Sequence, residues 1–279
     1  MDKIVEKVWD YSKNAEFYKY RPNYSPKAIS MLMDYVGAKT NNQEYSVADI
    51  GAGTGNLTIL LLDKGLSNVT AVEPNDEMRK IGEQVTGDKA KWIRATATET
   101  TLSGKYDWVT FGSSFNVIDR KLALKETSRI LKDGGFFTCM WNHRDLECPI
   151  QKTAEKIVES IVPNYERGVR REDQRPFLEK NANEFNDICY IEVDFSVERT
   201  IDEYILAWKS VKNKYWDLET EEGGAIFTKI VNKIREELPG TFEVRYTTRA
   251  WTMQKDCRCD HATRRFFSTG EELHKSSCV

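Results

Sequence analysis

Three alternating glycines interrupt the stretch Val47-Ala48-Asp49-Ile50-Gly51-Ala52-Gly53-Thr54-Gly55-Asn56-Leu57. An apolar strand pattern precedes the glycines and a helical pattern follows them. Glycines permit a tight turn and close approach of the backbone to a ligand, and a helix start offers unpaired N–H donors. A plain strand-to-helix turn gives the same pattern, because an isolated glycine motif is a weak signal. The residues around the turn must therefore decide whether it binds a ligand.

Two nearby positions narrow the choice of ligand. The dinucleotide-binding fingerprint has glycine at its sixth position, where this chain has Asn56, so a nicotinamide or flavin cofactor is disfavoured. Glu73 follows the next apolar run, 69–72, where an acidic side chain can accept hydrogen bonds from both ribose hydroxyls. A solvated glutamate at a strand end is the alternative without a ligand. Because no Gly-x-x-x-x-Gly-Lys-Ser/Thr phosphate loop is present, we expect a ribose-containing ligand without a pyrophosphate.

Strand and helix patterns alternate at short spacing on both sides of this turn, which predicts a mostly parallel sheet with helices on both faces. The expected strands are 45–50, 69–72, 90–94, 106–111 and 135–141, and the expected helices are 26–35, 57–64, 78–85 and 122–131. The regular alternation of strand and helix patterns ends after Trp141. The expected elements beyond it are a polar, mostly helical stretch to about 186, strands at 189–199 and 242–251, and helices at 202–213 and 222–238.

Composition excludes several classes of protein. The 279 residues are 40% hydrophobic, which is enough for a sizeable core, and fit one elaborated domain or two small ones. A net charge of −3 gives no basic excess for gripping nucleic acid. No signal peptide or membrane span is expected, and six scattered cysteines fit a reducing, cytoplasmic setting. Cys257, Cys259 and His261 lack a fourth ligand at a recognised spacing, so we expect no metal site.

Several ordered motifs resemble the class I S-adenosyl-L-methionine-dependent methyltransferases. They are Asp49-Ile50-Gly51-Ala52-Gly53-Thr54-Gly55, Ala71-Val72-Glu73-Pro74-Asn75, Ala95-Thr96-Ala97-Thr98-Glu99 and Leu131-Lys132-Asp133-Gly134-Gly135. The resemblance implies a Rossmann-like α/β sheet, mostly parallel with an antiparallel last strand, and a helical lid insertion. It implies S-adenosyl-L-methionine as the cofactor.

Further segments are similar to the small-molecule subgroup that includes trans-aconitate methyltransferase-like proteins. They are Arg21-Pro22-Asn23-Tyr24, Phe115-Asn116-Val117-Ile118-Asp119, the turn Trp141-Asn142-His143-Arg144-Asp145, and Arg245-Tyr246-Thr247-Thr248-Arg249. The resemblance covers roughly residues 9–255. Relatives often carry His-Trp where this chain has Asn116-Val117. If that histidine serves as a base in relatives, this chain lacks the base at that position.

We expect five parts along the chain. Residues 1–24 form an N-terminal segment that closes over the cofactor, 25–145 the cofactor-binding core, and 146–186 the helical lid. Residues 187–255 complete the sheet and the pocket, and 256–279 form a polar tail that we expect to be poorly ordered.

The resemblance also assigns roles to single residues. Asp49 supports the turn and the amino end of the cofactor, and Glu73 holds the ribose. The remaining expected cofactor contacts are Tyr20, Arg21, Gly51, Ala52, Gly53, Pro74, Thr96, Ala97, Gly112 and Ser113.

The acceptor is expected to be a small molecule, a natural product or a modified peptide. Our first choice is a carboxylate oxygen, because an anion needs positive groups and no general base. His143, Arg144 and Arg21 are the candidate acceptor-site residues. The alternatives are N- or hydroxyl O-methylation with His143 as the base, and a non-catalytic cofactor-binding protein. The oligomeric state stays open, with a monomer plausible.

Overall fold

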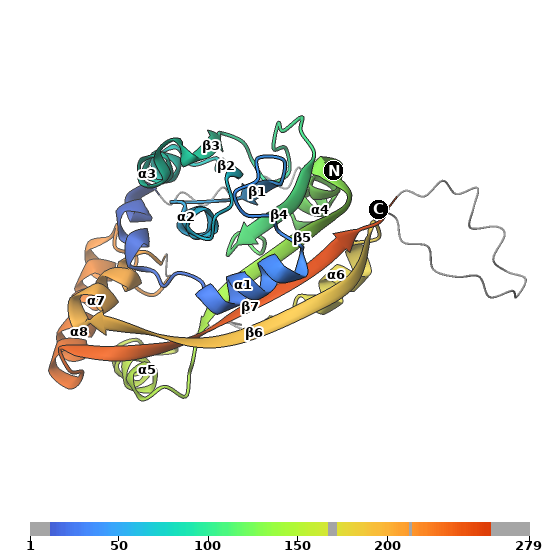
Figure 1. Cartoon of the computed structure of the whole chain (residues 1–279). Helices are drawn as coiled ribbons and strands as arrows, with labels where there is room; N and C mark the ends of the chain where they lie inside the picture. The colour runs from blue at the N-terminus through green and yellow to red at the C-terminus, as the bar shows by residue number, and fades with distance from the viewer. Residues whose placement is uncertain (1–11, 167–171, 212–213, 258–279) are drawn as a thin grey trace, which may run out of the picture.

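The computed structural model describes residues 12–166, 172–211 and 214–257. Their strands form one seven-stranded sheet in the order β3-β2-β1-β4-β5-β7-β6 (Figure 1). In chain order the strands are β1 (Ser46–Ile50), β2 (Asn68–Val72), β3 (Ala90–Ile93), β4 (Tyr106–Gly112), β5 (Leu131–Arg144), β6 (Phe185–Thr200) and β7 (Thr241–Lys255). Most of the tail predicted to be poorly ordered, with Cys259 and His261, lies outside the described residues.

The strand directions confirm the predicted fold class. Strands β1 to β5 are parallel to one another, whereas β7 is antiparallel to both β5 and β6. The chain order reverses between β1 and β4, which pair directly. Open α/β sheets bind ligands at the carboxyl ends of strands at such a reversal. The glycine turn follows β1 and therefore stands at this point.

The first α-helix begins where its capping residue predicts. Ser25 caps the first α-helix, with its Oγ accepting from the N–H of Ala28 at 3.3 Å, and Pro26 occupies the first turn. The described helices are η1 (Ser12–Tyr20), α1 (Pro26–Tyr35), α2 (Asn56–Asp63), α3 (Asp76–Thr86), η2 (Gly87–Lys89), α4 (Arg120–Ile130), α5 (Pro149–Ile161), α6 (Arg175–Asn181), α7 (Ile201–Lys209) and α8 (Glu221–Glu237).

Three hydrophobic clusters hold these layers together. One face of the central sheet packs against α1 and α2, and the opposite face packs against α4 and α6. The third cluster joins α5, α7 and α8 to the extended ends of β6 and β7. Figure 1 shows these two long strands side by side, running from near α6 to near α8. The segment predicted as one lid, 146–186, thus sends α5 and α6 into different clusters.

Strand β5 is longer than the sequence predicts. We expected it to end at Trp141 and placed His143 and Arg144 in the following turn, which is wrong. Both residues lie within β5, where their register partners on β7 are Thr247 and Tyr246. The antiparallel β7 pairs with β5 from Phe136 through Arg144, so polar residues that look like a turn continue the strand.

No helix in the described ranges combines the length and the apolar character needed to cross a membrane.

Candidate functional site

The turn after β1 is built around Gly51. This residue has φ +66°, and its N–H donates to the carbonyl of Val72 at 2.8 Å. A Cβ at Gly51 would stand 2.5 Å from the Cβ of Ser114, whose hydroxyl donates to the carbonyl of Ile50 at 2.7 Å. Glycine is therefore required here for two reasons, the backbone conformation and the absence of room.

Glu73 reaches this turn from the end of β2. One carboxylate oxygen accepts from the N–H of Gly53 at 2.8 Å, and the other accepts from the N–H of Asn75 at 2.9 Å. Burial raises the pKa of Glu73, although these two N–H donors act in the opposite direction. The side chain is only 6% exposed. The solvated-glutamate alternative is thereby excluded, and the carboxylate is held rigidly beside the glycine turn.

Asp49, the third polar group at this point, is fully buried at the end of β1. Its two carboxylate oxygens accept hydrogen bonds from the hydroxyls of Thr58, at 2.7 Å, and Thr110, at 3.1 Å. Burial raises its pKa to about 6, against the lowering effect of the two hydroxyls and with a smaller contribution from Glu73. A positive charge placed nearby would lower the pKa of Asp49 again, because such a charge stabilises the ionised carboxylate.

These groups line a cavity of about 600 Å³. The structure brings the following predicted residues together around it: Arg21, Asp49, Gly51, Ala52, Gly53, Glu73, Pro74, Thr96, Ala97, Gly112, Ser113, His143 and Arg144. Tyr20 does not line the cavity, and Tyr18 does so instead. The N–H of Ser113 donates to the carbonyl of Met140 at 2.8 Å, so a cofactor contact from Ser113 must use its carbonyl or its hydroxyl.

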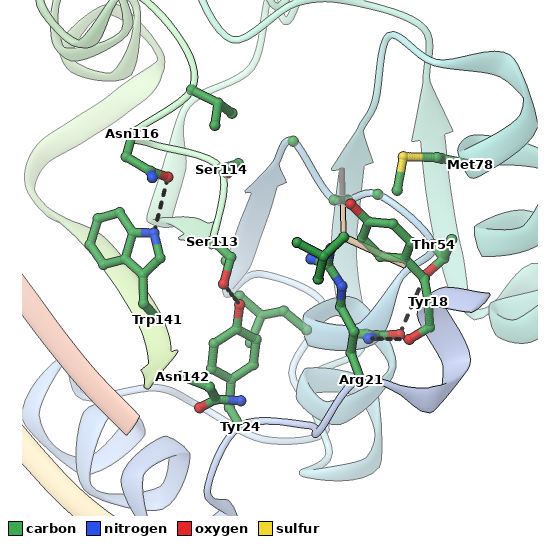
Figure 2. A pocket seen from close by; sticks show the side chains of 18 of the residues that line it. Tyr18, Arg21, Tyr24, Thr54, Met78, Ser113, Ser114, Asn116, Trp141 and Asn142 are labelled. Atoms are coloured by element: carbon green, nitrogen blue, oxygen red, sulfur yellow. Dashed lines mark hydrogen bonds between the residues drawn. The ribbon is translucent and has the colours of Figure 1, made fainter. Parts of the chain in front are cut away.

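The N-terminal segment is fastened across the cavity. The amide nitrogen of Asn142 donates to the carbonyls of Pro22 and Asn23, at 3.1 and 3.0 Å. Buried Tyr24 shares a 2.8 Å hydrogen bond with Ser113 (Figure 2). Thr248 donates to Asn142 and accepts from the N–H of the next residue, Ser25. These bonds join the segment and Ser25 to β5, to β7 and to the residue that follows β4.

Arg21 has structural partners of its own. Its Nε donates to the hydroxyl of Ser210 at 2.9 Å, and a second nitrogen donates to the Ser210 carbonyl at 2.6 Å. Its guanidinium lies 3.9 Å from the centre of the Tyr18 ring. Arg21 therefore links η1 to the end of α7 while it lines the cavity.

Beyond the glycine turn the cavity extends into a part that we call the C-terminal lobe. Its walls are Arg144, Leu146, Glu155, Ala207, Val211 and Tyr246. The guanidinium of Arg144 stands 5.9 Å from the ring centre of Tyr204 and 5.2 Å from that of Trp208. Burial lowers the pKa of Arg144, but electrostatic attraction to Tyr204, Tyr246 and Glu155 outweighs this effect. The pKa of Arg144 is therefore raised above its ordinary value. The lobe therefore contains a permanent positive charge.

His143 lines the cavity from a different direction. His143 and Arg144 are consecutive in β5, so their side chains leave opposite faces of the sheet. Trp141 shares the face of His143 and donates from its indole nitrogen to the side-chain oxygen of Asn116 at 3.1 Å (Figure 2). Asn116 thus holds the Trp141 ring at the cavity wall.

Sequence reasoning missed several cavity residues. Those not assigned to the site beforehand include Tyr18, Tyr24, Asn56, Met78, Asn116, Trp141, Asn142, Glu155 and Tyr246. Tyr24, Asn116, Trp141 and Asn142 belong to the motifs that carried the family resemblance, so a signal for them was available. Glu155 had no signal, because it is one of several charged residues in a polar helix.

The middle of the chain matches a known family. The methyltransferase domain family matches residues 48–139, from β1 to the middle of β5. This match supports a class I S-adenosylmethionine-dependent methyltransferase and S-adenosylmethionine as the cofactor of the cavity. The methyltransferase domain holds the glycine turn, Glu73 and the β4 end, whereas the C-terminal lobe begins after it.

Individual proteins that are similar to this chain are also methyltransferases. An uncharacterized methyltransferase of Mycobacterium tuberculosis is 33% identical over 126 residues, covering 45% of this chain and 48% of the relative. A demethylmenaquinone methyltransferase of Staphylococcus aureus is 33% identical over 98 residues, covering 33% of this chain and 41% of the relative. The chain spans about half the length, or less, of these curated relatives.

Solved structures show the same fold. The YcgJ protein of Bacillus subtilis has a TM-score of 0.51 at 14% identity, covering 83% of this chain and 99% of that one. A phosphoethanolamine N-methyltransferase 2 of Haemonchus contortus, solved with phosphomonomethylethanolamine and S-adenosylhomocysteine, has a TM-score of 0.50 at 14% identity. It covers 88% of this chain and 57% of that one.

Proposed function

We propose that this protein transfers a methyl group from S-adenosylmethionine to a carboxylate oxygen of a small molecule bound in the C-terminal lobe. One observation carries the proposal: a single cavity joins the glycine turn and Glu73 to the half-buried Arg144. The comparisons match methyltransferases in general and leave the trans-aconitate-type subgroup as a resemblance. A cytoplasmic setting stays a prediction.

The residues at the glycine turn fit the cofactor. The Glu73 carboxylate is fixed by two backbone N–H donors, and each of its oxygens keeps acceptor capacity for a ribose hydroxyl. The buried acid Asp49 suits the ammonium group of the methionine part, because a positive charge offsets the cost of its burial. Thr96 and Ala97 line the end of the cavity beyond β3, where the adenine would lie.

The chemistry divides between the cofactor and the chain. Bound S-adenosylmethionine supplies an electrophilic methyl group on a positively charged sulfur. Arg144 would hold the acceptor carboxylate, and an acceptor that is already an anion needs no proton removed. Tyr24 and the fastened N-terminal segment would cover the cofactor and exclude water from the reacting groups. The chain contributes mainly alignment, which can supply about 7–11 kcal/mol of barrier reduction.

A base-assisted reaction is the second candidate, because His143 lines the same cavity. In that case the acceptor would be an amine or a hydroxyl. His143→Gln keeps a hydrogen-bond donor but cannot accept a proton, so it separates the two reactions.

The test measures methyl transfer in two steps. The protein and S-adenosylmethionine are incubated with pooled carboxylic acids, and methyl esters are detected by mass spectrometry. The rate of His143→Gln at saturating acceptor is then measured from pH 6 to 9. Carboxylate methylation predicts that much of the rate is retained. A loss of a hundredfold or more that alkali restores would refute it and support a base.

A further inference from the structure

We infer that the methyl acceptor is a zwitterion, an amino acid or a related amino carboxylate, with its carboxylate held by Arg144 and its cationic group by Glu155. This inference rests on the proposed function, because it names the acceptor class of the same cavity. It goes beyond that proposal by giving a role to an acidic side chain that neither the sequence motifs nor the matched domain includes.

The C-terminal lobe presents two opposite charges from two different elements. Arg144 ends β5 and Glu155 lies in the middle of α5, and both line the cavity. Glu155 is only 8% exposed. The other acids that line the cavity, Asp49 and Glu73, stand at the glycine turn among the expected cofactor contacts. Among the described walls of the lobe, one cation therefore faces the acceptor together with one anion.

Two polar residues, Gln151 and Glu155, lie on the otherwise apolar buried face of α5. Gln151 lies one turn before Glu155, is 1% exposed, and accepts a hydrogen bond from the Tyr204 hydroxyl at 3.0 Å. Its amide nitrogen has no acceptor within the described ranges. These side chains stand among Ala154, Ile157 and Val158 of the α5–α7–α8 cluster. Of these two polar residues Glu155 lines the cavity, so it presents a carboxylate to a ligand in the C-terminal lobe.

The charge arrangement discriminates between classes of carboxylic acid. An acceptor with one carboxylate and one ammonium group presents a complementary charge to each of Arg144 and Glu155. A dicarboxylate or tricarboxylate would place its second anion beside Glu155, and like charges repel strongly where water is excluded. The apolar walls Leu146, Ala207 and Val211 leave space for a hydrophobic substituent. The lobe thus favours amino acids over polycarboxylates.

Matched pairs of ligands test the inference without knowledge of the natural acceptor. The full-length protein is loaded with S-adenosylhomocysteine and studied by saturation-transfer NMR. The probes are leucine with 4-methylpentanoate, phenylalanine with 3-phenylpropanoate, and glutamate with glutarate. We expect at least one amino acid to reach half-saturation at a concentration tenfold or more below that of its partner. Equal binding within every pair, preference for the partner, or no binding of any amino acid overturns the inference.

Two variants on α5 locate the ammonium site. Glu155→Gln keeps the shape of the side chain and should reduce the preference to about twofold. Glu159→Gln, an exposed position one turn later, should leave the tenfold preference unchanged. A preference that persists in Glu155→Gln overturns the assignment to Glu155. If Glu155→Gln fails to fold, the comparison of ligand pairs on the unaltered protein decides.

Calorimetry with S-adenosylhomocysteine separates the two levels of the proposal. A protein that does not bind this product contradicts the proposed function itself. A protein that binds it but shows no preference for amino acids contradicts only the acceptor class.

Discussion

The two ends of the cavity are built in different ways. The end at the glycine turn, which we propose binds the cofactor and call the cofactor end, uses residues 49–114, which stand at the carboxyl ends of the adjacent strands β1, β2 and β4. Most of its contacts depend on backbone geometry, as at Gly51 and at the N–H groups that Glu73 engages. The C-terminal lobe instead collects side chains from β5, α5, α7 and β7, which are far apart in the sequence.

The family match follows the same division. It spans residues 48–139 and stops before Arg144, the first wall of the C-terminal lobe. A cofactor common to many enzymes is compatible with one local motif, whereas an acceptor is selected by side chains that vary on the same fold. Substitutions at the two ends should accordingly have separable effects.

The largest effect is expected at the glycine turn. Gly51→Ala forces a Cβ to within 2.5 Å of Ser114 in a left-handed backbone conformation. Left-handed strain and overpacking together should cost about 2–5 kcal/mol of unfolding free energy and abolish cofactor binding. Denaturant unfolding and calorimetry with S-adenosylhomocysteine measure both.

Gly37→Ala is the matched control, because Gly37 has φ +62° and a Cβ added there would meet no neighbouring atom within 4 Å. The unfolding free energy of Gly37→Ala should fall by about 1–2 kcal/mol from backbone strain alone, and this variant should bind the cofactor product normally. Equal destabilisation in the two variants would contradict the steric argument at Gly51.

A pH effect of similar size is expected at Asp49. Its pKa in the folded protein is about 6, above the ordinary value of 3.8. The folded state therefore binds more protons between these values, and the unfolding free energy should fall as the pH rises from about 4 to 6. The linked change is on the order of 3 kcal/mol.

Asp49→Asn should lack this part of the pH dependence. Unfolding by denaturant at several pH values, without cofactor, compares the two proteins. Parallel curves for wild type and variant would show that Asp49 is not raised in pKa.

At the cofactor end, Glu73→Ala should weaken binding of S-adenosylhomocysteine by roughly ten- to a hundredfold. This corresponds to about 1.5–3 kcal/mol for the loss of a charged hydrogen-bond acceptor. Calorimetry provides the measurement, and circular dichroism confirms that the variant is folded. An unchanged affinity in a folded variant contradicts the ribose assignment.

In the C-terminal lobe, Arg144→Ala should weaken acceptor binding by a similar factor, about 1.5–3 kcal/mol, with no change in affinity for the cofactor product. The KM for a carboxylate that the protein methylates tests the first expectation. Calorimetry with S-adenosylhomocysteine tests the second. The pair of variants is most informative together. If Arg144→Ala weakens the cofactor product as much as Glu73→Ala does, the two ends of the cavity are not separate.

Local patterns were sufficient for the cofactor end. The alternation of strands and helices predicted the sheet, and the caps at Ser25 and Pro26 predicted the start of α1. The glycine turn and Glu73 were recognisable because a strand, a tight turn and a strand-end acid follow one another closely along the chain. The prediction that Tyr20 lines the cavity was wrong, and Tyr18 lines it instead. Both residues lie in a short 3₁₀ helix, whose orientation decides which side chain points into the cavity.

The sequence by itself determined the sheet, the glycine turn and the class of cofactor, because each depends on residues that are close along the chain. Only the tertiary structure decided that β5 continues through His143 and Arg144, because the hydrogen bonds that extend it come from β7. It also decided that Glu155 faces the same cavity as Arg144. The physical reason is that packing of α5 against α7, α8 and β7 orients these side chains, and no local pattern records contacts between such distant segments.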